Sequence, residues 1–467
     1  MSDQSPRLFW FRRDLRLADN PGLVAAADGG PVIPVFILDP ETEALGAAAK
    51  WRLGLSVADL ARRLEAAGSR LVLRRGAAPA VLSRLARDSG AAEVRWSRLY
   101  SPEAVARDTR VKEALKGAGL SATSHAGHLL HEPWRVATGT GAAFKVFTPF
   151  WNAIGRQDPD RPMAAPKLAA PARWPESERL EDWALGAAMR RGAAVVAEHV
   201  HVGEEAAARG LEEFIEGGLA RYREDRDRPD RGGGSGLSEN LTYGEISVRR
   251  IWYAVRDRGG AGSESFLREL GWREFAWHLL WHHPTLGTEN WRAEWDRFPW
   301  RGDGPDAENW RRGMTGEPMV DAGMREMFVT GTMHNRVRML VASYLTKHLL
   351  THWKVGLDWF ADCLTDWDPA ANAMNWQWVA GSGPDAAPYF RVFNPALQAT
   401  KFDSRGDYRR RFLLGFDGSA EAEARAFFEA APRSWKLDPG AAYPPPLVDL
   451  AAGRAAALAA YERHRGA

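Results

Sequence analysis

The sequence has few of the features that are typical of membrane proteins, secreted proteins or metal-binding proteins. It has 467 residues and one cysteine, Cys363, which excludes an internal disulfide framework and fits a reducing compartment. It has no apolar run long enough to cross a membrane and no apolar signal core at its N-terminus. No group of cysteines and histidines has zinc-site spacing. We therefore expect a cytoplasmic protein that lacks a metal site.

The chain also lacks a strong excess of charge of either sign. Its formal net charge is +2 at pH 7, so a nucleic-acid-binding surface would have to be a local basic patch. Tryptophan, in contrast, is abundant, with 21 residues. Most of them fit a helical core. Tryptophan is also redox-active and is difficult to accommodate because of its size. Its excess therefore requires a further explanation.

The first part of the chain alternates strand and helix patterns. Apolar runs at 7–15, 31–40, 69–76 and 92–100 predict strands, and helical stretches such as 55–68 separate them. This alternation predicts a parallel, helix-covered, Rossmann-like sheet within an α/β domain of residues 1–135. The dinucleotide-binding glycine pattern is missing after the first strand. A site for another ligand at a switch point of the sheet is still an alternative.

The rest of the chain predicts a connector and a second domain. Residues 155–200 are rich in proline, alanine and tryptophan with weak periodicity, and they predict a surface-wrapping connector that we bound at 136–204. Residues 205–467 have helical patterns almost throughout and predict an all-α domain without a long C-terminal tail. Its glycine-rich segment 223–236 is either a flexible loop or a place where backbone amides, with the hydroxyls of Ser235 and Ser238, meet a phosphate.

The segment 366–393 is the most informative part of the chain. It contains acids, an amide, two tryptophans and a glycine-rich loop within a short stretch. Trp376 and Trp378 are two positions apart, so on a helix they would point about 200° from each other. Such an arrangement suggests two separate surfaces that require an aromatic ring. The alternative is a pair of ordinary buried tryptophans.

Several motifs occur in one order along the chain. They are WFRRDLRLADNPGL near the start, then FKVFTPFWNA, GLSENLTYGEIS, ELGWREFAWHL, TGEPMVDAGMRE, TGTMHNRVRM and NWQWVAGSGPDAAPYFRVFNP. In this order and spacing they resemble the photolyase/cryptochrome family over nearly the whole chain, most closely a bacterial, class I-like cyclobutane pyrimidine dimer photolyase. The resemblance implies an α/β antenna domain followed by an all-helical FAD-binding domain.

The resemblance also implies a set of cofactor-binding residues. Residues expected at the flavin phosphates and ribityl chain are Tyr222, Ser235, Leu237, Ser238 and, for a phosphate, Arg273. Those expected around the isoalloxazine are an Arg338–Asp366 ion pair, Asp368 at the pyrimidine edge and Asn372 facing N5. The alternatives are a surface salt bridge for Arg338 and Asp366, and a helix cap before Pro369 for Asp368.

Five residues match the family's pocket for a flipped-out pyrimidine dimer: Glu269, Trp272, Asn335, Met339 and Trp378. Glu269 with Trp272, and Asn335 with Met339, each share one helical face. Relatives that repair (6-4) photoproducts usually carry histidine at the positions of Asn335 and Met339. Because both residues here do not titrate, the resemblance favours cyclobutane dimer repair.

Two further groups of residues match family positions. Trp376, Trp353 and Trp300 match a three-tryptophan wire between the flavin and the surface. Arg226, Arg336 and Arg391 match contacts with DNA phosphates, which give sequence-independent affinity. The run 409–411 either adds to this patch or is a solvated charge cluster. Three residues depart from the family pattern: Thr332 replaces tryptophan, Glu239 replaces proline and Glu317 replaces tyrosine.

The resemblance implies a light-driven enzyme, a deoxyribodipyrimidine photo-lyase. Reduced FAD would split cyclobutane pyrimidine dimers in UV-damaged DNA, and we expect a monomer. The alternatives are a signalling cryptochrome and a (6-4) photoproduct repair enzyme. For the antenna, the segment 100–108 resembles a folate-contacting region in which Glu103 is displaced by one place. We expect 5,10-methenyltetrahydrofolate, with an empty or flavin-filled site as alternatives.

Overall fold

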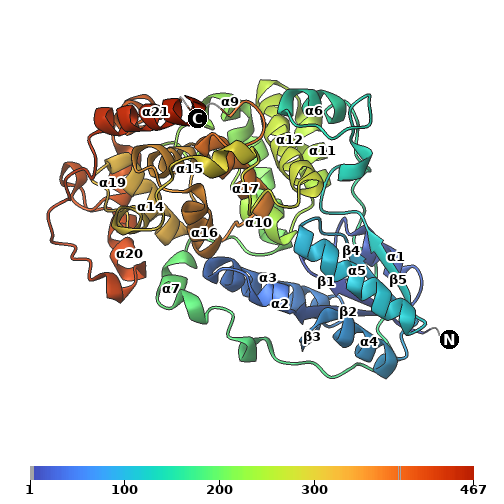
Figure 1. The fold of residues 1–467 in the computed structure, drawn as a ribbon. Coiled ribbons are helices and arrows are strands. Elements are labelled where there is room, and N and C mark those ends of the chain that lie inside the picture. Colours follow the sequence, from blue (N-terminus) through green and yellow to red (C-terminus); the bar gives the residue numbers. More distant parts are fainter. Residues whose placement is uncertain (1–4, 388, 390, 467) are drawn as a thin grey trace.

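The computed structural model describes residues 5–387, 389 and 391–466. An α/β part formed by the first third of the chain lies beside a larger helical part (Figure 1). A long segment without regular structure runs from one part to the other. The fold class predicted from the sequence is therefore confirmed.

The α/β part is built on one five-stranded parallel sheet with strand order β3-β2-β1-β4-β5. Its strands are β1 (Arg7–Phe11), β2 (Val32–Leu38), β3 (Val72–Arg75), β4 (Glu93–Ser97) and β5 (Ser121–His125). The first four lie in the predicted apolar runs. Strand β5 was not predicted, because an edge strand reading SATSH is half exposed and carries no apolar alternation.

Helices cover both faces of this sheet. Alternate residues of β1 point to opposite faces: Phe9 packs with α1 (Pro21–Ala27) and α3 (Ala47–Ala66). Trp10 packs on the other side with α4 (Ala78–Ser89) and α5 (Pro102–Gly117). Because β1 is buried on both faces, it reads as a continuous apolar run.

The predicted connector follows the surface of the α/β part. The backbone carbonyl of Ala169 accepts a hydrogen bond of 3.0 Å from Val32, and the amide of Glu178 donates one of 3.0 Å to Leu73. Two short helices lie in the 136–204 range, α6 (Phe147–Ile154) and α7 (Gly192–Val196). Of these, α6 packs against the helical part rather than the sheet.

The helical part contains the remaining helices. In chain order they are α8 (Glu204–Glu213), α9 (Tyr222–Asp225), α10 (Ser238–Tyr243), α11 (Val248–Arg258), α12 (Ala261–His282), α13 (Pro305–Arg311), α14 (Pro318–Thr330), α15 (Asn335–Ser343), α16 (Trp353–Cys363), α17 (Pro369–Ala380), α18 (Pro395–Phe402), α19 (Asp407–Phe412), α20 (Ala422–Ala430) and α21 (Leu450–Gly466); the short α2 (Pro40–Glu43) belongs to the α/β part. The largest apolar core lies among α14 to α17. Among the described residues, no helix is long and apolar enough to cross a membrane.

The two parts are joined by buried ion pairs. Asp19, which precedes α1, binds Arg249 on α11, and both side chains are almost fully buried. Arg52 on α3 binds Glu245, which follows α10, through two hydrogen bonds of 2.8 and 2.9 Å. Because a lone buried charge is costly, these pairs favour one relative placement of the two parts.

Candidate functional site

Three packed helices carry half of the predicted site residues. The long helix α12 contacts α17, and α17 also contacts α15. The short helix α9, which leads into the glycine-rich loop, contacts α12. Side chains predicted from distant stretches of sequence therefore meet in one region of the helical part.

The predicted Arg338–Asp366 ion pair is present. Nη2 of Arg338 lies 2.7 and 3.0 Å from the two carboxylate oxygens of Asp366, and Nε donates to the Met333 carbonyl at 2.7 Å. The Asp366 side chain is only 4% exposed, whereas that of Arg338 is 21% exposed. This is a largely buried pair, and it does not fit the alternative of a surface salt bridge.

Asp368 and Asn372 occupy the first turn of α17. One carboxylate oxygen of Asp368 accepts a hydrogen bond of 2.8 Å from the Ala371 amide, which confirms the predicted helix cap. The other oxygen accepts from the Trp277 indole at 3.0 Å. The amide nitrogen of Asn372 donates to the Asp368 carbonyl at 2.9 Å, which holds this buried side chain in one orientation.

The glycine-rich loop leaves its backbone accessible. In the described structure no heavy atom lies within 4 Å of the Cβ position at Gly232, Gly234 or Gly236. Ser235 accepts a hydrogen bond of 3.4 Å from the Leu237 amide, and Ser238 lies exposed in the first turn of α10. Open amides and hydroxyls of this kind suit a phosphate ester.

Tyr222 and Arg273 make contacts that the sequence did not indicate. Tyr222 is buried, and its ring packs against Phe214 and Phe266 at centroid distances of 5.6 and 5.1 Å. Arg273 donates to Glu274 at 3.1 Å and to the backbone carbonyl of His128 at 3.1 Å. Within the described chain Arg273 therefore holds the 128–131 segment to α12. Its role at a phosphate stays a prediction.

The residues at this site fit a flavin adenine dinucleotide. The isoalloxazine both donates and accepts hydrogen bonds, and the Arg338–Asp366 pair expected to flank it offers a donor beside an acceptor. The open glycine loop offers amides to a pyrophosphate. Asn372 presents a neutral amide, which can bond a ring without supplying an acidic proton.

The predicted pocket residues are all at least partly exposed. On α12, the carboxylate of Glu269 forms an ion pair with Arg226, and both side chains are 26% exposed. Burial raises the pKa of Glu269 while Arg226 opposes the rise. One face of Trp272 stacks on Phe147 of α6, with ring centroids 3.6 Å apart and planes inclined by 9°. No sequence signal identified Phe147 as the residue that orients this tryptophan.

Asn335 and Met339 occupy α15, and Trp378 occupies α17. Asn335 is exposed at the start of its helix, while Met339 and Trp378 pack partly against the largest core. His334 caps α15, since its Nδ1 accepts a hydrogen bond of 3.2 Å from the Arg336 amide. Burial lowers the pKa of His334 to about 4, so its ring is neutral at pH 7.

The predicted DNA-contacting arginines fall in two places. Arg226 binds the pocket residue Glu269, and Arg336, next to the pocket residue Asn335 in the chain, binds Asp227 at 2.7 Å. Arg391 lies in the loop after α17, where its backbone carbonyl accepts a hydrogen bond of 2.8 Å from the buried Lys347.

The basic run at 409–411 is matched by acids. Arg409 binds Asp403 at 2.8 Å, and Arg411 binds Glu423 at 2.9 Å. Arg410 binds Asp407 at 2.5 Å. A run whose charges are balanced by neighbouring carboxylates fits a charge cluster better than an added phosphate-binding patch, but Asp403 beside Arg409 is buried and not solvated.

The three predicted wire tryptophans lie on or near α16. Trp376 of α17 is buried against Gly356 of α16, where a Cβ atom would lie only 2.0 Å from the indole ring. Trp353 begins α16 and is fully buried. His352 lies between it and Trp300, with ring centroids 5.5 and 5.6 Å away. No sequence signal identified His352 as the residue between the two indoles.

The proposed antenna region is largely occupied by protein contacts. At the carboxyl ends of β1 and β4, where the strand order switches, Arg12 binds Asp108 at 2.5 Å and Arg107 binds Asp39 at 2.9 Å. All four side chains are buried. In the 100–108 segment, Glu103 is exposed. Buried ion pairs therefore lie at the switch point, whereas the Glu103 side chain is accessible.

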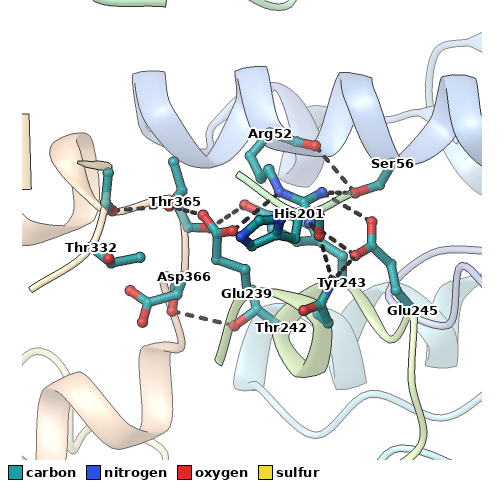
Figure 2. A network of polar contacts seen from close by, with 12 residues as sticks. Arg52, Ser56, His201, Glu239, Thr242, Tyr243, Glu245, Thr332, Thr365 and Asp366 are labelled. Carbon is teal, nitrogen blue, oxygen red and sulfur yellow. Dashed lines mark hydrogen bonds and ion pairs between the residues drawn. The ribbon is translucent and has the colours of Figure 1, made fainter. Parts of the chain in front are cut away.

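Glu239 and Thr332, two of the departures from the family pattern, lie in the same region (Figure 2). Only Glu239 belongs to the network of polar contacts there, since Thr332 forms its hydrogen bonds with Thr330. Glu239 is buried and contacts Thr365, the residue before Asp366. Glu317 lies elsewhere, before α14, and burial together with nearby Asp321 raises its pKa to about 7.

Two family models match the chain: DNA photolyase over residues 7–168 and the FAD binding domain of DNA photolyase over residues 266–463. A deoxyribodipyrimidine photo-lyase from Agrobacterium fabrum is 46% identical, with 98% of each chain covered. Cryptochrome-2 from Arabidopsis thaliana is 37% identical over 87% of this chain and 70% of its own length.

A solved structure is also closely similar. The crystal structure of a bacterial class III photolyase from Agrobacterium tumefaciens has a TM-score of 0.92 at 45% identity, covering 99% of this chain and 98% of its own. This relative is assigned to class III, whereas the motifs led us to expect a class I-like photolyase. Similarity in sequence and fold extends over the full length of both chains. The chain therefore belongs to the photolyase/cryptochrome family.

Proposed function

We propose that this protein is a light-driven deoxyribodipyrimidine photo-lyase that splits cyclobutane pyrimidine dimers in UV-damaged DNA. The observation that carries the proposal is the set of partly exposed residues Glu269, Trp272, Asn335, Met339 and Trp378 on three packed helices, in a chain similar over its full length to a photo-lyase. Aromatic faces, an acid and an amide are the groups that an extruded pyrimidine pair would need.

The Arg338–Asp366 pair, Asp368 and Asn372 would hold the isoalloxazine of FAD, and Ser235, Ser238 and the amides around them would hold its phosphates. When bound and reduced, FAD supplies a light-excitable electron donor. The protein holds these isoalloxazine-binding side chains in place, because Asn372 donates a hydrogen bond to the Asp368 carbonyl and Asp368 accepts one from an amide of α17. Tyr222 and Leu237 would line the cofactor with apolar surface, and Arg273 remains a proposed phosphate contact.

The pocket residues would bind the dimer without acid–base chemistry. Trp272, held by Phe147, and Trp378 would cover apolar faces of the bases. Glu269 and Asn335 would bond carbonyl and imide groups. The nearby histidine, His334, is neutral and uses Nδ1 as a helix cap, so it is a poor proton donor at pH 7. This favours cyclobutane dimers over (6-4) photoproducts.

Arg226, Arg336 and Arg391 would contact DNA phosphates around the extruded dimer. The ion pairs of Arg226 with Glu269 and of Arg336 with Asp227 orient these arginines beside the pocket. Phosphate contacts carry little sequence information, which suits an enzyme that recognises damage. For the antenna, we propose 5,10-methenyltetrahydrofolate contacting the exposed Glu103, because the switch point is filled by buried ion pairs.

The test is repair of an oligonucleotide that contains one thymine dimer, by dithionite-reduced protein, in light and in darkness. A (6-4) substrate is run beside it. Splitting of the thymine dimer only in light would support the proposal. Splitting of the (6-4) substrate instead would overturn the substrate assignment. A flavin-loaded, photoreducible protein that splits neither lesion would overturn the enzymatic function and favour a signalling photoreceptor.

A further inference from the structure

Glu239 occupies a buried position between the two parts of the molecule. It lies in α10, is 7% exposed, and its two carboxyl oxygens have different neighbours. One oxygen contacts the hydroxyl of Thr365, and the other lies 3.7 Å from Nε of Arg52 on α3 (Figure 2). The acid thus connects the α/β part to the segment that carries Asp366.

The cations around Glu239 already have carboxylate partners. Arg52 is fully buried and is matched by Glu245 through two hydrogen bonds of 2.8 and 2.9 Å. Arg338 is matched by Asp366. An ionised Glu239, which is 7% exposed, would therefore add an unmatched negative charge beside these two pairs. Such an excess charge is costly, and protonation of the acid removes it.

The hydrogen-bond donors around Thr365 lead to the same conclusion. Its hydroxyl oxygen contacts Glu239 and also lies 2.9 Å from the backbone carbonyl of Gly331. A hydroxyl has one proton and cannot donate to two acceptors at once. If Glu239 carries a proton, it donates to Thr365, and Thr365 in turn donates to Gly331. Both contacts are then true hydrogen bonds.

We propose that Glu239 is a protonated positioning residue that links Arg52 of the α/β part to Asp366, and that loss of its proton disturbs the Arg338–Asp366 pair. The path is short: Thr365 precedes Asp366, and Thr242 of α10 donates to the Asp366 carbonyl at 3.2 Å. The coupling to the cofactor rests on the proposed function, because that function places FAD beside Asp366.

The groups that face Glu239 predict where it titrates. Burial is the main cause that raises the pKa of Glu239, to about 7, with Asp366 and Glu245 adding to the rise and Arg52 and Thr365 opposing it. Tyr243 of α10 also faces it. Arg13 reaches over the Tyr243 ring from the α/β part, at 6.0 Å. Ionisation would therefore occur within the physiological pH range.

The first measurement is infrared spectroscopy of the FAD-bound protein over a pH series. Wild-type protein should show a band of a protonated carboxylic acid that disappears with a midpoint near pH 7 and is missing in Glu239→Gln. Glutamine keeps a donor to Thr365 without a titrating group. Glu326→Gln is the matched control, since burial also raises the pKa of that acid to about 7, and it should remove a different band.

The second measurement is the reduction potential of the bound flavin over the same pH series. Wild-type protein should show an inflection near the midpoint of the infrared band, and Glu239→Gln should lack it. Thr365→Val should keep the infrared band but lose the inflection. If Glu239→Gln removes no band, or leaves the inflection unchanged, the inference is wrong. Dimer splitting is scored separately, so an intact band and inflection without splitting would overturn only the proposed function.

Discussion

Gly356 on α16 provides a sharp test of how the proposed electron-transfer wire is packed. A Cβ atom at this position would lie 2.0, 2.4 and 2.7 Å from Cη2, Cζ3 and Cζ2 of Trp376. Because ordinary carbon contacts are about 3.5–4.0 Å, Gly356→Ala must push the indole or the helix away by about 1.5 Å. Trp376 is buried against Phe360 and Trp310, so it has little room to move.

We expect Gly356→Ala to destabilise the protein in spite of alanine's better helix propensity. Overpacking costs about 1–3 kcal/mol, and replacing a helical glycine by alanine returns up to about 1 kcal/mol. After the full propensity gain, the net loss is up to about 2 kcal/mol, seen as a lower midpoint in thermal unfolding followed by circular dichroism. Photoreduction of oxidised flavin should also slow, because the displaced ring is the proposed first member of the wire.

A matched control and a double variant separate packing from propensity. Gly117→Ala, at the exposed end of α5 where no described heavy atom is within 4 Å of the Cβ position, should be neutral or stabilising. Trp376→Phe removes the outer ring atoms, so Gly356→Ala should cost less in that background while photoreduction remains slow. If the two substitutions add within about 0.5 kcal/mol, or Gly356→Ala changes neither stability nor photoreduction, the packing argument is refuted.

Three further outcomes are expected. Trp300→Phe should slow photoreduction, because it removes a proposed wire residue. It should leave repair by dithionite-reduced protein nearly intact, because the Trp300 indole nitrogen has no hydrogen-bond partner to lose among the described residues. Equal loss of photoreduction and repair would contradict the wire. Arg336→Gln should lower the slope of log affinity for DNA against log salt by about 1, without changing sequence preference. As pH rises from about 4.5 to 7, the free energy of unfolding of the wild-type protein should fall by up to about 3 kcal/mol more than that of Glu239→Gln. The reason is that folded Glu239 keeps a proton that the unfolded chain has lost. Parallel pH profiles of the two proteins would argue against a raised pKa of Glu239.

Much of the fold follows from patterns that involve neighbouring residues. Strands β1 to β4 are predicted by apolar runs because both faces of their sheet are covered. The start of α17 is predicted by Asp368 and Pro369, since a cap and a first-turn proline act within one turn of helix. Strand β5 was missed because its order depends on pairing with β4, and not on its own apolar residues.

Some features of the candidate site could be predicted from sequence motifs, and others are visible only in the structure. Family motifs indicated the Arg338–Asp366 pair and the pocket residues, and the structure brings Arg338 and Asp366 together. The motifs did not indicate that Arg273 would hold His128, that Phe147 would stack on Trp272, or that His352 would lie between two wire residues. These contacts join segments whose relative placement no local pattern encodes.

By itself, the sequence determined the order of the elements, the helix caps and the chemical types of the site residues, because these depend on residues within a few positions of one another. Only the tertiary structure decided which buried charges meet. Glu239 lies near Arg52 and Thr365, although 187 and 126 positions separate them in the chain. Whether that acid carries a proton depends on burial and on the partners its neighbours already have, and both arise only when the chain is packed.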